Sequence, residues 1–330
     1  PAEKVFGEDG LRLMRLARVC GETGFKPDEE SMQGARDNAR LLRDISAERI
    51  FGELRFILHA DGKYGVKYGH YAALCVMRDT GVLASIFPEL ALGAGMTQRQ
   101  DFHMYDVLEH SLRCAMYAPD DIRLVALLHD VGKPYCKITS GNFYNHEKEG
   151  ARIVAEICER LKVPKKLAEE TVRLTSLHMY DGGGNVRESK IRRMIVSNRD
   201  VFFKLVELKQ ADYSACRDDL SEAPAITRWR EIYGEMIKEG VPFNLRELKV
   251  RGDDLIAEGI PKAKCGKVLD RLLLECAVLP QLNERNKLII TAKRVVRDID
   301  DCKNKRCPGC ARAPFNVWRI NLKGRHICPD

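Results

Sequence analysis

Apolar residues recur along almost the whole chain at the three- and four-residue spacing that places side chains on one face of a helix. Near the amino terminus this spacing is followed by Leu13, Leu16, Ala17 and Cys20. The strict alternation of apolar and polar residues that is typical of strands is scarce. Helix stops are expected at three glycine positions, namely Gly24, Gly132 and the run 182–184. The pattern therefore predicts an all-α protein.

One apolar run ends in two polar residues that suit a functional site. The continuous run 124–128 is followed by His129 and Asp130, and then by Gly132 and Pro134. This order predicts a buried helix that is closed by Gly132 as a C-cap, with Pro134 preventing its continuation. His129 and Asp130 then fall in the last turn, where unpaired carbonyl groups and the helix dipole favour a cation. Taken alone, His129 is more often a satisfied core histidine.

Other polar side chains favour a functional site over a satisfied core histidine, because they occupy positions comparable to that of His129. Four of them lie at a predicted helix end or on a buried helix, namely His110, His146, His178 and Asp212. Burying so many imidazole and carboxylate groups without partners is costly, and a shared metal ion removes the cost. All of these ligands are nitrogen or oxygen donors, so we expect Mn, Mg, Fe, Co or Ni, with Zn as an alternative.

This arrangement resembles the HD-domain phosphohydrolases, a family of helical metalloenzymes that hydrolyse phosphate esters. The resemblance spans residues 103–216. It implies a core set of metal ligands and two additional histidines, which match those of family members that hold a second metal. The core set is His110, His129, Asp130 and Asp212, and the additional pair is His146 and His178. Lys133 matches a basic residue near the phosphate. The resemblance thus implies that Asp130 and Lys133 act in catalysis.

Charged residues near the amino terminus form a second candidate site. Glu8 and Asp9 precede Arg12 by four and three residues, and Arg15 follows it by three. A continuous helix would place all four on one face, opposite the apolar stripe. On spacing alone, a solvated and salt-bridged helix face is the favoured interpretation.

Three segments in order resemble the class II CCA-adding tRNA nucleotidyltransferases and the related bacterial poly(A) polymerases. They are EDGLRLMRLARVCGETGF, ISAERIFGEL and the downstream histidine–aspartate domain. The resemblance implies that the first segment binds incoming CTP or ATP: Asp9 and Arg12 would read the base, Glu8 would support Arg12, and Arg15 would meet the triphosphate. A guanidinium beside a carboxylate can pair with either base. The family has proline where this chain has Gly10, which loosens the first turn.

The resemblance covers residues 1–297, and the segment 248–289 resembles the helical tail that holds tRNA in that family. It implies tRNA as a partner, and CTP and ATP as substrates of the full-length enzyme. The family's catalytic head, a sheet with paired aspartates that uses Mg, has no counterpart here. We therefore expect the head to lie in the same longer chain or in a partner subunit, and no nucleotidyl transfer from this chain alone.

The charge distribution separates the last quarter of the chain from the rest. The formal net charge is +7, and residues 245–330 hold 19 lysines and arginines against 11 aspartates and glutamates. Phosphate contacts with RNA and a solubilising role explain this excess equally well. We expect four regions: a helical neck at 1–60 with nucleotide and RNA contacts, an HD domain at 61–220, a basic helical tRNA-binding body at 221–300, and a basic cysteine-containing tail at 301–330.

The cysteines and the hydropathy indicate a cytoplasmic setting. No apolar stretch is long enough to span a bilayer, and no basic-then-apolar leader opens the chain, so we expect no membrane association. Twelve cysteines without such a leader indicate mostly free thiols. The tail holds a Cys-x-x-Cys pair with two further cysteines, which permits a zinc site made of Cys302, Cys307, Cys310 and Cys328. An irregular basic tail with free thiols is the favoured alternative.

Three functions therefore remain open. The favoured one is the carboxy-terminal portion of a CCA-adding enzyme for tRNA 3′-end processing, which also carries an intact metal-dependent phosphohydrolase site. The second is a stand-alone HD-domain phosphohydrolase that acts on nucleotides or 2′,3′-cyclic phosphates. The third is a tRNA-binding module without catalysis.

Overall fold

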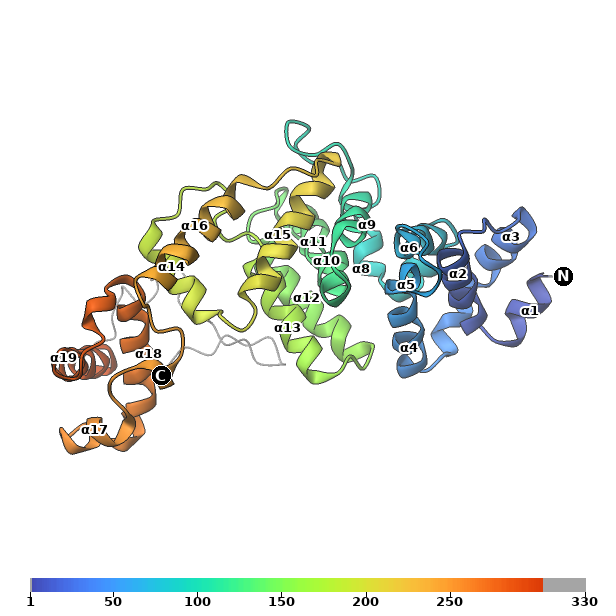
Figure 1. Ribbon diagram of the computed structural model, residues 1–330. Helices are drawn as coiled ribbons and strands as arrows, with labels where there is room; N and C mark the ends of the chain where they lie inside the picture. Colours follow the sequence, from blue (N-terminus) through green and yellow to red (C-terminus); the bar gives the residue numbers. More distant parts are fainter. Residues whose placement is uncertain (1, 305–330) are drawn as a thin grey trace. The chain divides into compact units, whose positions relative to one another are not determined.

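The computed structural model describes residues 2–304, and helices joined by turns make up this range without any strand (Figure 1). The all-α prediction is therefore confirmed. The chain divides into two compact units. The first contains the described residues up to Tyr180 together with Lys204–Ala223, and the second contains Asp181–Phe203 and the described residues from Pro224 onward. No helix among residues 2–304 has both the length and the apolar character needed to cross a bilayer.

The amino-terminal part of the first unit is built around α2, which packs against α4, α5 and α6. Its buried stripe contains Leu13, Ala17 and Cys20 as the apolar spacing predicts, whereas Leu16 is half-buried and Met14 is fully buried. The elements of this part are α1 (Ala2–Glu8), α2 (Leu11–Thr23), α3 (Glu29–Asn38), the 3₁₀ turn η1 (Ala39–Asp44), α4 (Ala47–Leu58), α5 (Ala60–Tyr64), α6 (Gly69–Asp79), α7 (Val82–Ile86) and α8 (Pro88–Ala91).

The expected continuous helix through the first charged cluster is interrupted. Helix α1 ends at Glu8 and α2 begins at Leu11, so Glu8 and Arg12 lie on different helices. The Asp9 carboxylate accepts a hydrogen bond from the Leu11 N–H at 3.1 Å, which satisfies a donor at the start of α2. A carboxylate that bonds the backbone in this way favours a helix start over a helix interior.

The remainder of the first unit is a cluster of helices that supports the histidine–aspartate set. Helix α9 packs on α10, α10 packs on α13, and α12 packs on both α11 and α13. Every residue of α10 is buried, which agrees with its continuous apolar run. The elements are α9 (Val107–Tyr117), the 3₁₀ turn η2 (Asp120–Ile122), α10 (Arg123–Leu128), α11 (Gly132–Ser140), α12 (His146–Arg160), α13 (Lys165–Leu177) and α15 (Phe202–Arg217).

The prediction that Gly132 closes the buried helix is wrong. Helix α10 ends at Leu128, and Gly132 is the first residue of α11, with Pro134 in the first turn where its missing N–H is tolerated. A glycine is needed here because α11 and α12 come very close. A Cβ atom on Gly132 would lie 2.2 Å from the carbonyl oxygen of His146 and 2.5 Å from the nitrogen of Gly150.

The second unit places α14 against α16 and α18, and α18 against α17 and α19. Trp229 of α16 is fully buried, and its indole N–H donates a hydrogen bond to Asp181 at 3.0 Å. The elements are α14 (Glu188–Ser197), α16 (Pro224–Lys238), the 3₁₀ turn η3 (Leu245–Glu247), α17 (Gly252–Ala257), α18 (Lys262–Val278), the 3₁₀ turn η4 (Pro280–Leu282) and α19 (Arg285–Asn304).

Candidate metal centre

The structure brings all six side chains of the predicted metal set together inside the first unit. His110 projects from α9, His129 and Asp130 follow the end of α10, and the others come from α12, α13 and α15. His146 is the first residue of α12, His178 follows the last residue of α13, and Asp212 lies within α15. Helix ends therefore supply four of the six side chains.

Asp130 lies at the middle of this set, and each of its oxygens faces a different group. Its Oδ2 lies 3.4 Å from His110 Nε2 and 3.3 Å from His129 Nε2. The Asp212 carboxylate closes this first group, because its Oδ1 lies 3.0 Å from His110 Nε2 and 3.7 Å from His129 Nε2.

The other oxygen of Asp130 faces the second group. Its Oδ1 lies 3.2 Å from His146 Nε2 and 3.5 Å from His178 Nε2, and these two nitrogens are 3.2 Å apart. The ligand atoms of each group, His110, His129 and Asp212 on one side and Asp130, His146 and His178 on the other, all lie within 4.8 Å of one another. Each group therefore has the dimensions of a metal-binding site.

Backbone carbonyls set the orientation of three of the four imidazoles. Nδ1 of His129, His146 and His178 bonds the carbonyl of the residue three positions earlier, at 2.7, 2.8 and 2.7 Å. A carbonyl only accepts, so Nδ1 carries a proton and Nε2 is the nitrogen directed at the site, where a metal would take the place of any proton on it. This is the ring orientation that a metal ligand requires. His110 differs, because its Nδ1 is buried without a hydrogen-bond partner among the described residues.

The electrostatics of the centre favour ionised carboxylates. Burial raises the pKa of Asp130, but the nearby charges of His129 and Lys133 outweigh it and hold that pKa well below its usual value. Burial likewise opposes the ionised form of Asp212, yet its pKa is also lowered well below the usual value by His110 and His129. Burial also opposes the charged form of His129 and so lowers its pKa, but the Asp130 carboxylate outweighs burial and raises that pKa well above its usual value. The anionic oxygens thus draw positive charge into a buried site.

Unsatisfied polar atoms indicate that the set fits a cation. His110 and His129 are fully buried and Asp130 is 1% exposed, yet Nε2 of both histidines and both oxygens of Asp130 meet only the ion-pair contacts of the centre itself and form no well-aligned hydrogen bond within residues 2–304. Buried polar groups normally find partners, and leaving these bare costs free energy. Divalent metal ions accept nitrogen and oxygen donors together. The His/Asp groups of the described chain can therefore hold a metal.

Lys133 points into the same centre from the first turn of α11. Its ammonium lies 2.6 Å from Asp130 Oδ2 and 2.7 Å from Gln98 Oε1. The side chain is buried, so its charge acts on the centre with little screening by water. Gln98 was not singled out from the sequence, because it lies in a segment without helical periodicity.

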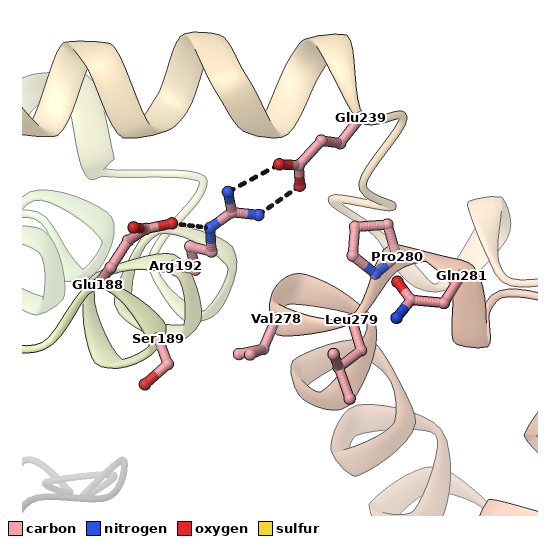
Figure 2. Close-up of a pocket in the computed structure, with 8 residues that line it drawn as sticks. All are labelled: Glu188, Ser189, Arg192, Glu239, Val278, Leu279, Pro280 and Gln281. Carbon is pink, nitrogen blue, oxygen red and sulfur yellow. Dashed lines mark hydrogen bonds and ion pairs between the residues drawn. The ribbon is translucent and has the colours of Figure 1, made fainter.

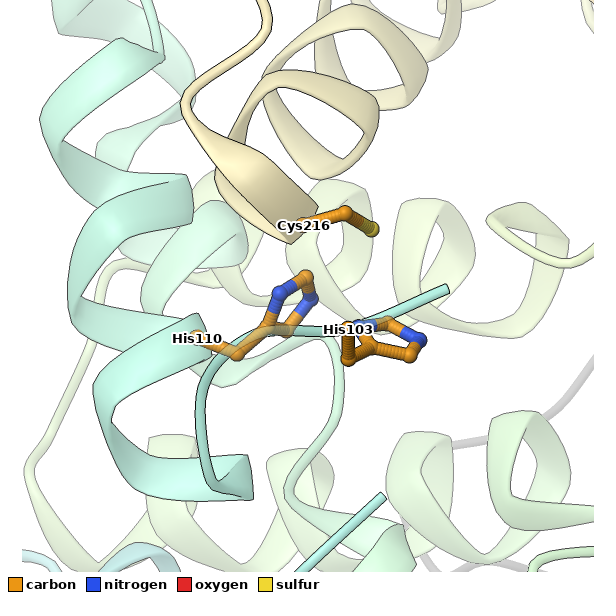
Figure 3. A group of neighbouring side chains, drawn as sticks. All are labelled: His103, His110 and Cys216. Atoms are coloured by element: carbon orange, nitrogen blue, oxygen red, sulfur yellow. The ribbon is translucent and has the colours of Figure 1, made fainter. Parts of the chain in front are cut away.

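Two further side chains border the centre, and sequence reasoning missed both. His103, His110 and Cys216 place one ligand atom each within 4.8 Å of one another, and Figure 3 shows the three side chains facing a common space. Cys216 lies four residues after Asp212, so a helical repeat from that aspartate could have found it. His103 precedes α9 and carries no periodic signal.

The predicted nucleotide-binding residues lie together at the junction of α1 and α2. The Arg12 guanidinium donates to Glu8 Oε2 at 2.8 Å and to the Val5 carbonyl at 2.8 Å. Asp9 instead pairs with Arg49 of α4 at 3.1 Å, a residue that was not singled out from the sequence. The hydrogen bond from Leu11 holds the pKa of Asp9 below its usual value. Arg15 is exposed on the next turn of α2.

The second unit contains a pocket of about 770 Å³ beside α14 and α18, away from any predicted site residue (Figure 2). The charge in it is already matched, because Arg192 pairs with Glu188 and makes a two-point contact with Glu239. Its lining residues are Glu188, Ser189, Arg192, Glu239, Val278, Leu279, Pro280 and Gln281.

The proposed zinc ligands Cys307, Cys310 and Cys328 lie outside the described residues, as does the side chain of Cys302.

Comparisons with protein-family models place two domains in the chain. The model of the HD domain matches residues 101–206, and the model of the probable RNA and SrmB-binding site of polymerase A matches residues 24–92. The first match contains the ligands from α9 to α13, and the second contains α3 to α8.

Relatives of known name agree with these matches. The CC-adding tRNA nucleotidyltransferase of Thermus thermophilus is 29% identical over 255 residues, covering 71% of this chain and 55% of that protein. The A-adding enzyme of Deinococcus radiodurans is 29% identical over 230 residues, covering 63% and 50%. The multifunctional CCA protein of Chromobacterium violaceum is 29% identical over 217 residues, covering 62% and 48%. The chain thus spans about half the length of the curated relatives that it matches.

A solved structure supports the fold. The Bacillus stearothermophilus CCA-adding enzyme, solved in complex with CTP, superposes with a TM-score of 0.53 at 19% identity, covering 91% of this chain and 65% of that one. With two family models, several relatives and a shared fold in agreement, the resemblance is confirmed: this chain carries an HD domain and a polymerase A-type RNA-binding region, and it is similar to CC-adding and A-adding tRNA nucleotidyltransferases and to a multifunctional CCA protein.

Proposed function

We propose that the first unit is a metal-dependent phosphohydrolase. The observation that carries the proposal is the centre around Asp130, where buried nitrogen and oxygen atoms converge in two groups with the dimensions of metal sites. His110, His129, Asp130 and Asp212 would hold one metal, and His146 and His178 would complete a second position through the other oxygen of Asp130. The metal, when bound, would act as a Lewis acid that offsets charge on a phosphoryl oxygen and activates an attacking water.

The residues of the chain itself supply orientation and charge. The carbonyl bonds to Nδ1 keep Nε2 of His129, His146 and His178 directed at the centre before any substrate arrives. Asp130 positions the Lys133 ammonium at 2.6 Å, and this point charge would attract the oxygens of a phosphate ester to the mouth of the centre. The resemblance to HD-domain enzymes favours a 2′,3′-cyclic phosphate or a 2′-nucleotide as the substrate.

The test compares Asp130→Asn with Asp270→Asn, which removes an exposed carboxylate on α18. Chelator-stripped protein is supplied with Mn²⁺, Ni²⁺, Co²⁺ or Mg²⁺, and turnover of bis-p-nitrophenyl phosphate and 2′,3′-cyclic AMP is measured beside metal content. We expect turnover in the wild type and in Asp270→Asn, and loss of both turnover and bound metal in Asp130→Asn. Absence of turnover with every ion in the wild type contradicts the proposal.

We also propose that the chain contacts tRNA and nucleotides as part of a tRNA 3′-end-processing enzyme. The RNA-binding match at residues 24–92 and the named relatives support this proposal. Arg12 and Asp9 would read the base of CTP or ATP, with Glu8 bracing Arg12 across the gap between α1 and α2. Nucleotidyl transfer would further require a sheet-based head, and residues 2–304 contain no strand.

Binding of CTP and ATP to the isolated chain tests this second proposal. Calorimetry with Arg12→Ala is compared with Arg43→Ala, a basic residue at the end of η1. A loss of at least tenfold in nucleotide affinity for Arg12→Ala alone is expected. Equal binding by both variants contradicts the assigned role. We retain the division into neck, HD domain, basic body and cysteine-containing tail as part of the same proposal.

A further inference from the structure

The loop before α9 is hydrogen-bonded to the carboxy-terminal end of α15. The backbone N–H of Met104 donates to the Cys216 carbonyl at 2.9 Å. The Arg217 guanidinium donates to three carbonyls of the loop, those of Gln100 at 3.2 Å, Phe102 at 3.3 Å and Asp101. These bonds join segments more than one hundred residues apart in the sequence. They fix the position of His103 relative to Cys216.

This hydrogen-bonded loop packs His103 against His110. The centroids of the two imidazole rings are 4.9 Å apart with the planes nearly perpendicular. Nδ1 of His103 is buried without a hydrogen-bond partner in the described chain, and so is Nδ1 of His110. A pair of buried imidazoles that leave two nitrogens unsatisfied is costly unless a ligand completes them.

The third member of this cluster is a thiol. Cys216 lies one turn after Asp212 on α15, and its Sγ donates to the Asp212 carbonyl at 3.3 Å. The ligand atoms of His103, His110 and Cys216 lie within 4.8 Å of one another (Figure 3). Burial raises the pKa of Cys216 to about 12, so the thiol stays protonated until a cation displaces its proton.

We propose that His103 and Cys216, together with His110, form a nitrogen–sulfur metal subsite at the outer end of the centre, and that it binds a thiophilic divalent ion such as Zn²⁺ or Co²⁺. On binding, the S–H bond breaks, a metal–sulfur bond forms and one proton leaves to the solvent. Sulfur and imidazole donors favour Zn²⁺ and Co²⁺ over Mg²⁺ and Mn²⁺. The subsite extends the oxygen–nitrogen set that the sequence predicts, and it does not require that the centre hydrolyse a phosphate ester.

Cobalt spectroscopy tests the subsite without an activity assay. The full chain is prepared with Cys302, Cys307, Cys310 and Cys328 replaced by serine, because these tail thiols would also bind cobalt. Chelator-stripped protein is titrated with Co²⁺, and the thiolate-to-cobalt charge-transfer absorption in the near ultraviolet is followed. We expect the band in this background, its loss in Cys216→Ser, and at least tenfold weaker cobalt binding in His103→Ala.

Two matched variants separate Cys216 from other buried thiols. Cys158 of α12 is buried, and its pKa is likewise raised to about 12 by burial, so Cys158→Ser should keep the band. Cys114 is buried beside His129, so Cys114→Ser should also keep it. A band that survives Cys216→Ser, or that disappears with Cys114→Ser, overturns the proposal, and so does the absence of a band in the background protein.

A second measurement uses unmutated protein and therefore does not depend on the folding of a variant. Alkylation of Cys216 by iodoacetamide is followed by mass spectrometry with Zn²⁺ or with Mg²⁺ at equal concentration. We expect Zn²⁺ to slow the alkylation of Cys216 at least tenfold relative to Mg²⁺. Equal rates with the two ions overturn the proposal, whatever the outcome of the phosphohydrolase assay.

Discussion

Replacing Gly132 by alanine should destabilise the first unit and disturb the metal centre together. The added Cβ would lie 2.2 Å from the His146 carbonyl oxygen and 2.5 Å from the Gly150 nitrogen. Both neighbours are backbone atoms of α12, so no side chain can rotate away. The helices must separate by roughly 1 Å, and overpacking of this kind costs about 1–3 kcal/mol. The better helix propensity of alanine returns less than about 1 kcal/mol.

The matched control is Gly52→Ala within α4, where a Cβ would meet nothing within 4 Å. This control should gain about 0.5–1 kcal/mol because alanine loses less backbone entropy than glycine in a helix. For a unit of this size, 1 kcal/mol corresponds to about 2–4 °C in Tm. We therefore expect thermal denaturation to show Gly132→Ala lowered by several degrees and Gly52→Ala slightly raised.

The metal readout distinguishes a local effect from general loss of folding. His146 begins α12, so a displaced α12 moves its Nε2 away from Asp130 Oδ1, now 3.2 Å distant. Metal affinity measured below the transition temperature should fall at least tenfold in Gly132→Ala and stay unchanged in Gly52→Ala. If Gly132→Ala is as stable as the wild type and binds metal equally, the close contact between α11 and α12 is not what selects glycine here.

Four other results are expected. Saturating the centre with Co²⁺ at about 100 times its Kd should add about 2.7 kcal/mol to the free energy of unfolding, visible as a higher Tm that EDTA reverses; an unchanged Tm would count against a folded-state metal site. Burial raises the pKa of Asp218, but hydrogen bonds from two tyrosines and an arginine lower it below its usual value. The ionised Asp218 carboxylate therefore stabilises the folded state above the unfolded-state pKa. This stabilisation disappears as the pH falls through the folded-state pKa. The wild type should therefore lose more thermal stability than Asp218→Asn between about pH 5 and pH 2. Trp229→Phe removes the indole donor of buried Asp181 and should cost about 1–3 kcal/mol in urea denaturation, whereas a cost near zero would mean that another donor replaces it. If α19 holds tRNA, the double substitution Arg294→Gln and Arg297→Gln removes two exposed positive charges from the interface. The slope of log K against log salt, measured by filter binding, should then fall by about 0.7–0.9 for each lost phosphate contact. An unchanged slope would show that these residues do not contact the RNA.

The helical class and the convergence of the six histidine and aspartate side chains could be predicted because both depend on patterns local to a segment. A three- and four-residue apolar spacing specifies a buried face, and a polar residue at the end of such a face must meet partners inside the protein. His129, His146 and His178 each satisfy this condition within their own helices. Their pairing around the two oxygens of Asp130 was not predictable, because it depends on how α10, α12 and α13 pack.

Other features of the structure could not be predicted, because they depend on contacts that sequence patterns do not contain. Gly132 was recognised as important, but a helix stop and a close helix contact select the same residue, and only the position of α12 distinguishes them. The helix break at Asp9 depends on a side-chain bond to the Leu11 backbone, which competes with helix continuation. His103 was missed because its loop is held by Arg217, more than one hundred residues away.

The carbonyl bonds that orient His129, His146 and His178 have a consequence for how freely the surrounding sequence can change. Each acceptor is the backbone of Ala126, Phe143 or Thr175, three positions before its histidine. Every amino acid supplies a backbone carbonyl, so side chains at those three positions can be exchanged without altering the proton position on the imidazole. A centre oriented by side-chain carboxylates would have to keep each of them. Here the neighbouring positions can drift or be redesigned for packing and stability, provided that the turn itself is preserved.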